Sequence, residues 1–175
     1  MDKDGLTDLV VQTEDEVYLF RKTGLKPVAW EHIRIPKPEA TRWLPRPTGV
    51  ADLDGDGRLD IVGMLIHDEK GNLPVDKASV FWMEYTGDKP TSINWKTHAI
   101  KWSDAVNSGR DNMGEKWDHV RFVDIDGDGD LDIIGNCEQH YARGYRTLVG
   151  VVWFENTVAQ RNQAKRATKR EPSDK

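Results

Sequence analysis

The sequence lacks the features that define several large classes of protein. Its 175 residues include a single cysteine, Cys137, which excludes an internal disulfide. No apolar run approaches the roughly 18 residues that a membrane-spanning helix requires, and the first residues lack the apolar segment of a signal peptide. Apolar residues nowhere keep the 3.6-residue period of an amphipathic helix over helical length. The sequence therefore indicates neither a membrane span nor a helical fold.

The composition suits a folded domain followed by a polar tail. Hydrophobic residues make up 37% and charged residues 31% of the chain, and the formal net charge is −5. Residues 158–175 carry six basic and two acidic side chains and few large apolar ones. Such a segment cannot offset the entropy of its own ordering, so we expect a disordered basic tail. We interpret this tail as a solvated terminus and expect no nucleic-acid partner.

An internal repeat dominates the rest of the chain. Residues 50–63 and 122–135 share the pattern Asp-x-Asp-Gly-Asp-Gly-x-x-Asp, followed by two β-branched residues and a glycine. Residues 2–10 repeat the later part of this pattern. The last aspartates of the three motifs are Asp8, Asp60 and Asp132, which are spaced by 52 and 72 residues. Periods of this length indicate repeated supersecondary units with loops of variable length.

Short β-branched and aromatic segments accompany the motifs, and they predict strands. The expected strands include residues 17–20, 30–35, 48–52, 59–65, 80–84, 95–100, 119–124, 131–137 and 151–155. A complete unit, such as the one that begins at residue 48, contains four of them. Four antiparallel strands per repeat form one blade of a β-propeller.

We therefore expect an all-β chain of about two and a half blades, a partial β-propeller. The blades lie near residues 1–35, 46–102 and 117–157, with three, four and three strands. Because propellers close with roughly four to eight blades, these blades cannot form a ring alone. The sequence thus predicts the C-terminal part of a longer propeller, completed by its remaining blades or by a second copy.

The aspartate motifs carry the chemistry of a calcium site. Ca²⁺ takes six to eight oxygen ligands, and carboxylates at motif positions 1, 3 and 5 can surround an ion. Glycines between them permit the positive φ angles of a tight loop. A backbone carbonyl at position 7 and the aspartate at position 9 complete the expected set. The ligands are Asp52, Asp54, Asp56, Arg58 and Asp60, then Asp124, Asp126, Asp128, Asp130 and Asp132, and in the partial motif Asp2, Asp4, Leu6 and Asp8.

Two other interpretations of these loops are weaker. An EF-hand or dockerin loop needs an acidic residue at position 12, where this chain has Gly63 or Gly135, and its flanks are helical rather than strand-like. A metal-free acidic turn would leave four carboxylates within about 6 Å of one another, where they repel strongly. The sequence favours Ca²⁺ in both complete loops and leaves the partial loop open.

The motifs at residues 52–60 and 124–132, each followed by Ile-Val or Ile-Ile, resemble the FG-GAP/VCBS repeat of integrin-α-like proteins. The resemblance covers nearly everything except the tail. It implies a β-propeller, usually of seven blades, with Ca²⁺ in the loop between the first two strands of a blade. It also implies an extracellular, periplasmic or surface-associated protein. Many members of this family are binding or adhesion modules, and some propellers of this general kind are polysaccharide lyases.

Four long loops opposite the aspartate motifs, at residues 36–47, 67–77, 101–117 and 138–149, are the expected place of ligand binding. Aromatic and arginine side chains there suit stacking on sugars and pairing with their carboxylates. The candidates are Trp43, Trp102, Arg110, Trp117, His140, Tyr141, Arg143 and Tyr145. We expect a non-enzymatic module that binds carbohydrate or protein. The alternative is the C-terminal part of a propeller-fold polysaccharide lyase, with His140 and one of the two tyrosines as base and acid.

Other aromatic residues recur in step with the repeat and are assigned to the fold. The tryptophans Trp30, Trp82, Trp95 and Trp153 recur in the expected strands, and we expect them in the core. His32 and His98 recur within the last strand of their units, which indicates a structural role.

Overall fold

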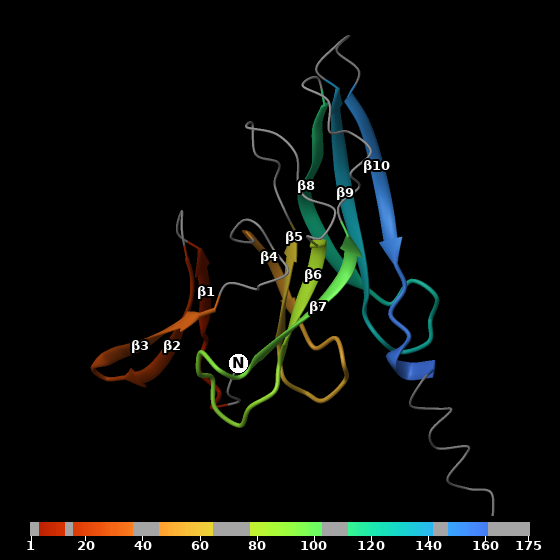
Figure 1. Ribbon diagram of the computed structural model, residues 1–175. Coiled ribbons are helices and arrows are strands. Elements are labelled where there is room, and N and C mark those ends of the chain that lie inside the picture. Colours follow the sequence, from red (N-terminus) through yellow and green to blue (C-terminus); the bar gives the residue numbers. More distant parts are fainter. Residues whose placement is uncertain are drawn as a thin grey trace, which may run out of the picture.

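The computed structural model describes residues 4–12, 16–36, 46–64, 78–102, 112–141 and 147–160, with some side chains at strand ends left out. The described chain is nearly all β, with ten strands in three antiparallel sheets (Figure 1). The sheets contain three, four and three strands in chain order. The predicted fold class, a partial β-propeller built from antiparallel blades, is confirmed.

The first sheet has the order β1-β2-β3. It consists of β1 (Leu9–Gln12), β2 (Val17–Leu25) and β3 (Val28–Ile35). Alternate residues of β2 are buried at its start, which fits the period of two that a half-buried strand shows. This sheet corresponds to the predicted blade that begins within its aspartate motif.

The second sheet is a complete four-stranded unit with the order β4-β5-β6-β7. It consists of β4 (Arg46–Ala51), β5 (Asp60–Met64), β6 (Ala78–Tyr85) and β7 (Trp95–Trp102). Every residue of β5 is buried. A strand that is buried on both faces lies inside a stack of sheets, and β5 does so between the first and third sheets (Figure 1).

The third sheet has the order β10-β9-β8 and is longer than the sequence suggested. It consists of β8 (Asn112–Val123), β9 (Asp132–Tyr141) and β10 (Thr147–Phe154). The expectation of a loop over residues 138–149 is wrong at both ends, since Leu148 pairs with Gln139 and Thr147 with His140. The ladder joins backbone groups, so polar residues can extend it although their side chains give no strand signal.

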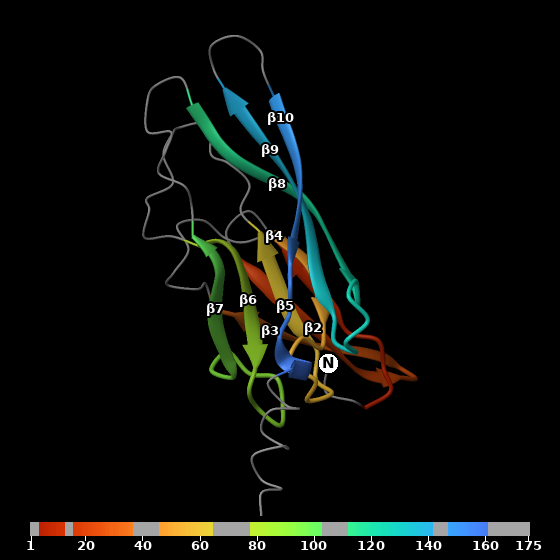
Figure 2. The same cartoon turned by 90° about the vertical axis from the view of Figure 1, so that its right-hand side faces the viewer.

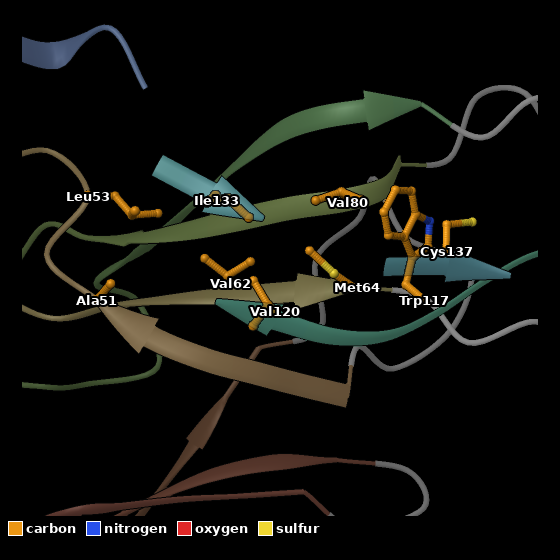
Figure 3. Close-up of a cluster of buried hydrophobic side chains, with 9 residues drawn as sticks. All are labelled: Ala51, Leu53, Val62, Met64, Val80, Trp117, Val120, Ile133 and Cys137. Carbon is orange, nitrogen blue, oxygen red and sulfur yellow. The ribbon is translucent and has the colours of Figure 1, made fainter. Parts of the chain in front are cut away.

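The middle sheet buries a hydrophobic cluster on each face. Side chains alternate across a strand, so Ile61 and Phe81 join the cluster with the first sheet, whereas Val62 and Val80 join the cluster with the third. The first cluster contains Val17, Leu19, Ile35, Ile61, Ala78, Phe81 and Met83. The second contains Ala51, Leu53, Val62, Met64, Val80, Trp117, Val120, Ile133 and Cys137 (Figure 3). Cys137, the single cysteine of the sequence, is buried within this second cluster.

The third sheet also has two apolar faces, but only one of them is covered by another sheet in the described residues. Val80 of β6 is fully buried between sheets, and Trp82 packs against the same cluster. Val151 and Trp153 hold the matching places on β10, yet they are 76% and 46% exposed. Within the described residues, no further sheet covers this face. The exposed surface at Val151 and Trp153 thus corresponds to the surface through which the second sheet contacts the third.

The repeated tryptophans therefore divide into two groups. Trp82 and Trp95 are partly buried, and the Trp82 ring stacks on His98 with centroids 4.5 Å apart. Trp30 and Trp153 are exposed, so the prediction that all four lie in the core is wrong for these two. A strand pattern identifies which face a side chain occupies, but a second sheet must cover that face to bury it.

The chain beyond β10 begins a short helical turn at residues 158–160, where the sequence placed the start of the disordered tail. Residues 161–175 lie outside the described part of the chain. None of the helical segments that the structure describes is long and apolar enough to cross a membrane.

Candidate metal centres

Both complete aspartate motifs form loops at the same end of the molecule. One loop joins β4 to β5 and the other joins β8 to β9, and the turn between β6 and β7 lies at that end as well (Figures 1 and 2). β7 ends at Trp102, at the opposite end of its sheet (Figure 1). The carboxylates of both complete loops thus gather at one end of the sheets.

The first complete loop gathers three carboxylates around one point. Oxygens of Asp52, Asp54 and Asp56 all lie within 4.8 Å of one another. Backbone N–H groups hold these side chains in place: Gly57 donates to Asp52 Oδ2 at 2.7 Å, and the Asp56 N–H donates to Asp54 Oδ1 at 3.0 Å. The N–H of Arg58 donates to Asp56 Oδ1 at 2.7 Å. The motif therefore orders its own acidic side chains.

The second loop repeats these contacts one for one. Oxygens of Asp124, Asp126 and Asp128 lie within 4.8 Å of one another. Gly129 donates to Asp124 Oδ2 at 3.1 Å, and the N–H of Asp130 donates to Asp128 Oδ1 at 3.1 Å. The partial motif keeps the last of these bonds, since Leu6 N–H donates to Asp4 Oδ1 at 2.8 Å. Asp2 lies outside the described residues.

The glycines have the backbone conformation that the sequence predicts. Gly55 and Gly57 have φ values of 73° and 83°, and Gly127 and Gly129 have 78° and 97°. L side chains rarely adopt such angles, so a glycine at these places lets the loop curl without strain. No heavy atom lies within 4 Å of a Cβ built at Gly55. Backbone conformation, rather than lack of space, requires glycine there.

The ninth motif residue is a buried anchor. Asp60 is 1% exposed. One of its oxygens accepts the N–H of Leu53 at 3.2 Å, and the other accepts the N–H of Tyr85 at 2.9 Å. Burial raises the pKa of this carboxyl to about 7, although the two N–H donors lower it. The cluster of three loop carboxylates does not include Asp60, whose bonds fasten the loop to the end of β6.

The same anchor recurs in the other two motifs. Asp132 is also 1% exposed, and it accepts the N–H groups of Ile125 at 3.1 Å and Asn156 at 2.7 Å. Asp8 accepts the N–H of Lys22 at 3.1 Å. In each sheet, the last aspartate of the motif thus accepts a backbone N–H from a residue of the second strand after the motif, or from just beyond that strand. This residue is Tyr85 at the end of β6, Asn156 after β10, and Lys22 next to the irregularity in β2. The repeated sequence pattern indicates these aspartates but not their backbone partners.

Each complete loop contains carboxylate oxygens that are buried without a hydrogen-bond partner among the described residues. Asp52 Oδ1 is one in the first loop, and Asp128 Oδ2 and Asp130 Oδ1 are two in the second. Desolvation, together with the charges of neighbouring aspartates, raises the pKa of Asp54 and of Asp130 above the ordinary value. Buried carboxylate oxygens normally have a donor or a cation as a partner, so these atoms fit a bound metal ion.

The expected ligand-binding residues are described only in part. Trp102 is 51% exposed at the end of β7, as a surface residue should be. Trp117 is only 2% exposed and its ring lies 5.8 Å from that of Phe154, so its assignment to a surface loop is corrected to the core. It lies within β8, which starts earlier than expected. Trp43, Arg110, Arg143 and Tyr145, and the side chains of His140 and Tyr141, lie outside the described residues.

The hydrogen bonds shared by the three motifs indicate one repeat unit used three times. Residues 1–63 match the FG-GAP-like repeat. The matched segment includes β1 to β4, most of β5 and the first complete aspartate loop. Outside the matched segment, residues 122–135 of the third sheet repeat the sequence pattern of residues 50–63. No curated protein and no solved structure matches the chain significantly.

Proposed function

We propose that this chain is a calcium-stabilised propeller segment that acts as a binding or adhesion module for a carbohydrate or a protein. The observation that carries the proposal is the pair of carboxylate clusters with buried oxygens that lack hydrogen-bond partners in the described residues. An FG-GAP-like repeat over residues 1–63 supports the propeller-type module.

The donor set of the loops suits Ca²⁺ best. All candidate ligands are carboxylate or backbone oxygens, which are the ligands of hard cations, and no histidine or cysteine belongs to either cluster. Mg²⁺ demands near-octahedral geometry and keeps several waters, whereas Ca²⁺ accepts six to eight oxygens in flexible arrangements. A bound Ca²⁺ ion would neutralise the crowded carboxylates. Asp60 and Asp132 would hold each loop against its sheet.

The binding role concerns the end of the sheets opposite the metal loops. Trp102 offers a large exposed ring there, and aromatic rings stack on the apolar faces of sugars. We also propose that a further blade, from the same protein or a second copy, covers Val151 and Trp153, because their counterparts Val80 and Trp82 face such a blade. We also propose an extracellular or periplasmic location, which the FG-GAP-like repeat over residues 1–63 supports. Nothing in the described residues favours the lyase alternative.

Calcium titration by calorimetry tests the metal part of the proposal. The wild-type chain should bind two Ca²⁺ ions, and Asp54→Asn or Asp126→Asn should each remove one. Asp88→Asn, a change in the exposed turn between β6 and β7, should leave both sites intact. Absence of a heat of binding in the folded wild-type chain would refute the calcium assignment.

Affinity electrophoresis tests the binding part. Gels that contain a soluble acidic polysaccharide, such as polygalacturonate, should retard the wild-type chain but not Trp102→Ala. Trp30→Ala is the matched control, because Trp30 is similarly exposed but lies on the first sheet. Equal mobility of wild type and Trp102→Ala in every such gel would contradict a carbohydrate-binding role for this end of the sheets.

A further inference from the structure

Asn156 lies where the two complete aspartate loops approach each other. It follows β10, and its backbone N–H donates to Asp132 Oδ1 at 2.7 Å. Its side-chain Nδ2 donates to the Leu53 carbonyl at 2.7 Å and to the Leu131 carbonyl at 3.1 Å. Its Oδ1 accepts the N–H of Val158 at 3.2 Å. One side chain thus bonds to two loops that belong to different sheets.

The two carbonyls belong to the loops' own backbone. Leu53 lies between Asp52 and Asp54 in the first loop, and Leu131 directly precedes Asp132 in the second. Any movement that a bound ion imposes on either segment acts on the Asn156 amide. A planar amide donates two hydrogens in a fixed geometry, so both carbonyls must keep compatible positions for both bonds to persist.

The packing around Asn156 makes this polar link more important. A cavity of about 210 Å³ opens at this place, lined by residues of both sheets that include Leu53, Trp82, Ile133, Phe154 and Asn156. Close-packed side chains normally fix the distance between neighbouring sheets. Here a cavity lies beside the contact between the second and third sheets, so less side-chain packing holds the two loops in place. The hydrogen bonds of Asn156 therefore contribute more to the relative position of the loops.

The second and third sheets differ in the residue at the position of this link. Tyr85 holds the place in the second sheet that Asn156 holds in the third, since its N–H donates to Asp60 as that of Asn156 donates to Asp132. The Tyr85 ring, however, packs beside Trp95 with centroids 5.2 Å apart. The repeat therefore conserves the backbone bond from unit to unit, while the bridging amide belongs to Asn156.

We infer that Asn156 is a positioning residue that couples the two calcium loops, so that an ion in one loop raises the affinity of the other. This inference rests on the proposed calcium function. Coupling between sites is reciprocal and commonly changes affinity by about five-fold or more. Loss of Ca²⁺ from either loop should therefore lower the Ca²⁺ affinity of the other loop by the same factor, although the proposed sites share no ligand.

A mutant cycle followed by Ca²⁺ calorimetry measures the coupling on the whole chain. Asp54→Asn disables the first loop, and we expect it to weaken Ca²⁺ binding at residues 124–132 by about five-fold. When Asn156 is already replaced by Ala or Asp, the additional Asp54→Asn change should alter the Ca²⁺ affinity of residues 124–132 by less than about two-fold. Asn156→Asp keeps the size and the acceptor oxygen but removes both donor hydrogens, so it tests the link if the alanine variant fails to fold.

Asn94→Ala is the matched control, because the hydrogen bonds of Asn94 remain within the turn at residues 86–94. It should retain the five-fold coupling. If the wild-type loops bind Ca²⁺ independently, or if coupling survives both Asn156 variants, the inference is wrong while the calcium proposal stands. If the folded wild-type chain binds no Ca²⁺, the calcium proposal itself fails.

Discussion

Arg58 and Asp130 occupy the same position in the two aspartate loops and carry opposite charges. The Arg58 guanidinium forms an ion pair with Asp56, and its Nε donates to the Tyr85 carbonyl at 3.1 Å. Asp130 instead adds a carboxylate to its loop, and its Oδ2 accepts the N–H of Ala159 at 2.8 Å. The loops therefore share backbone geometry but differ in net charge at their seventh position.

This difference predicts that the loop at residues 124–132 binds Ca²⁺ more tightly than the loop at residues 52–60, since ligand charge tunes the affinity of such sites. Arg58→Ala removes a cation that competes for Asp56. It should raise the affinity of the first loop by about two- to five-fold, the range of a partly exposed ion pair. Asp130→Asn should lower the affinity of the second loop. Calorimetric titration of each variant measures both effects.

Lys89→Ala controls for the general effect of removing a positive charge, because Lys89 is exposed in the turn between β6 and β7. It should change neither affinity by more than a small factor. An Arg58→Ala chain whose first loop binds Ca²⁺ more weakly would show that Arg58 supports the loop rather than competing with the ion.

The contact between Gly135 and Trp117 predicts a position that does not tolerate a larger residue. A Cβ at Gly135 would come within 2.9 Å of Trp117 Cζ3 and 3.1 Å of Met64 Cε. Gly135→Ala should therefore destabilise the folded state by about 1–3 kcal/mol through overpacking. Gly150→Ala, where no atom lies within 4 Å of the new Cβ, should change stability by much less. Urea unfolding compares the two, and equal midpoints would contradict this packing.

Trp117 itself should be among the most sensitive core positions. It is buried in the cluster between the second and third sheets. Trp117→Ala leaves a large cavity, which costs about 3–5 kcal/mol for aromatic side chains. Trp102→Ala removes the same side chain from an exposed place and should have a small effect on the urea midpoint. If the two variants were equally stable, Trp117 would not have the buried role assigned to it.

Calcium removal should destabilise the chain. An ion that binds only the folded state adds about 2.7 kcal/mol per site at 100 times its dissociation constant. For a chain of this size that is roughly 5–10 °C in melting temperature per site. Differential scanning calorimetry with excess Ca²⁺ or EDTA should show this shift for the wild type and a smaller one for Asp56→Ala. An identical melting temperature in both buffers would contradict metal-dependent stability.

The sequence predicted the architecture well because each unit carries local signals. The motif ending at Asp60 and the β-branched segment beginning at Val80 repeat at Asp132 and Val151, so strand order follows from the alignment of units. Positive φ at Gly57 followed from the same motif. These features depend on neighbouring residues in the chain, which is the information that a single sequence contains.

Other features depend on contacts between sheets and could not be predicted in this way. Trp82 and Trp153 hold the same place in the repeat, yet one packs against a neighbouring sheet and the other is exposed. The hydrogen bond from Asn156 to Leu53 joins residues 103 positions apart. The sequence predicts a loop over residues 101–117, but β8 begins at Asn112 and includes Trp117 because its backbone pairs with β9.

The number of Ca²⁺ ions held by the intact chain is the decisive measurement for the aspartate loops as calcium sites. Native mass spectrometry after chelation and reloading with Ca²⁺ should show two ions on the wild-type chain. Asp56→Ala and Asp128→Ala should each retain one ion, and the double variant should retain none. A folded wild-type chain without bound Ca²⁺, or a double variant that still holds two ions, would contradict the assignment of the aspartate loops as calcium sites.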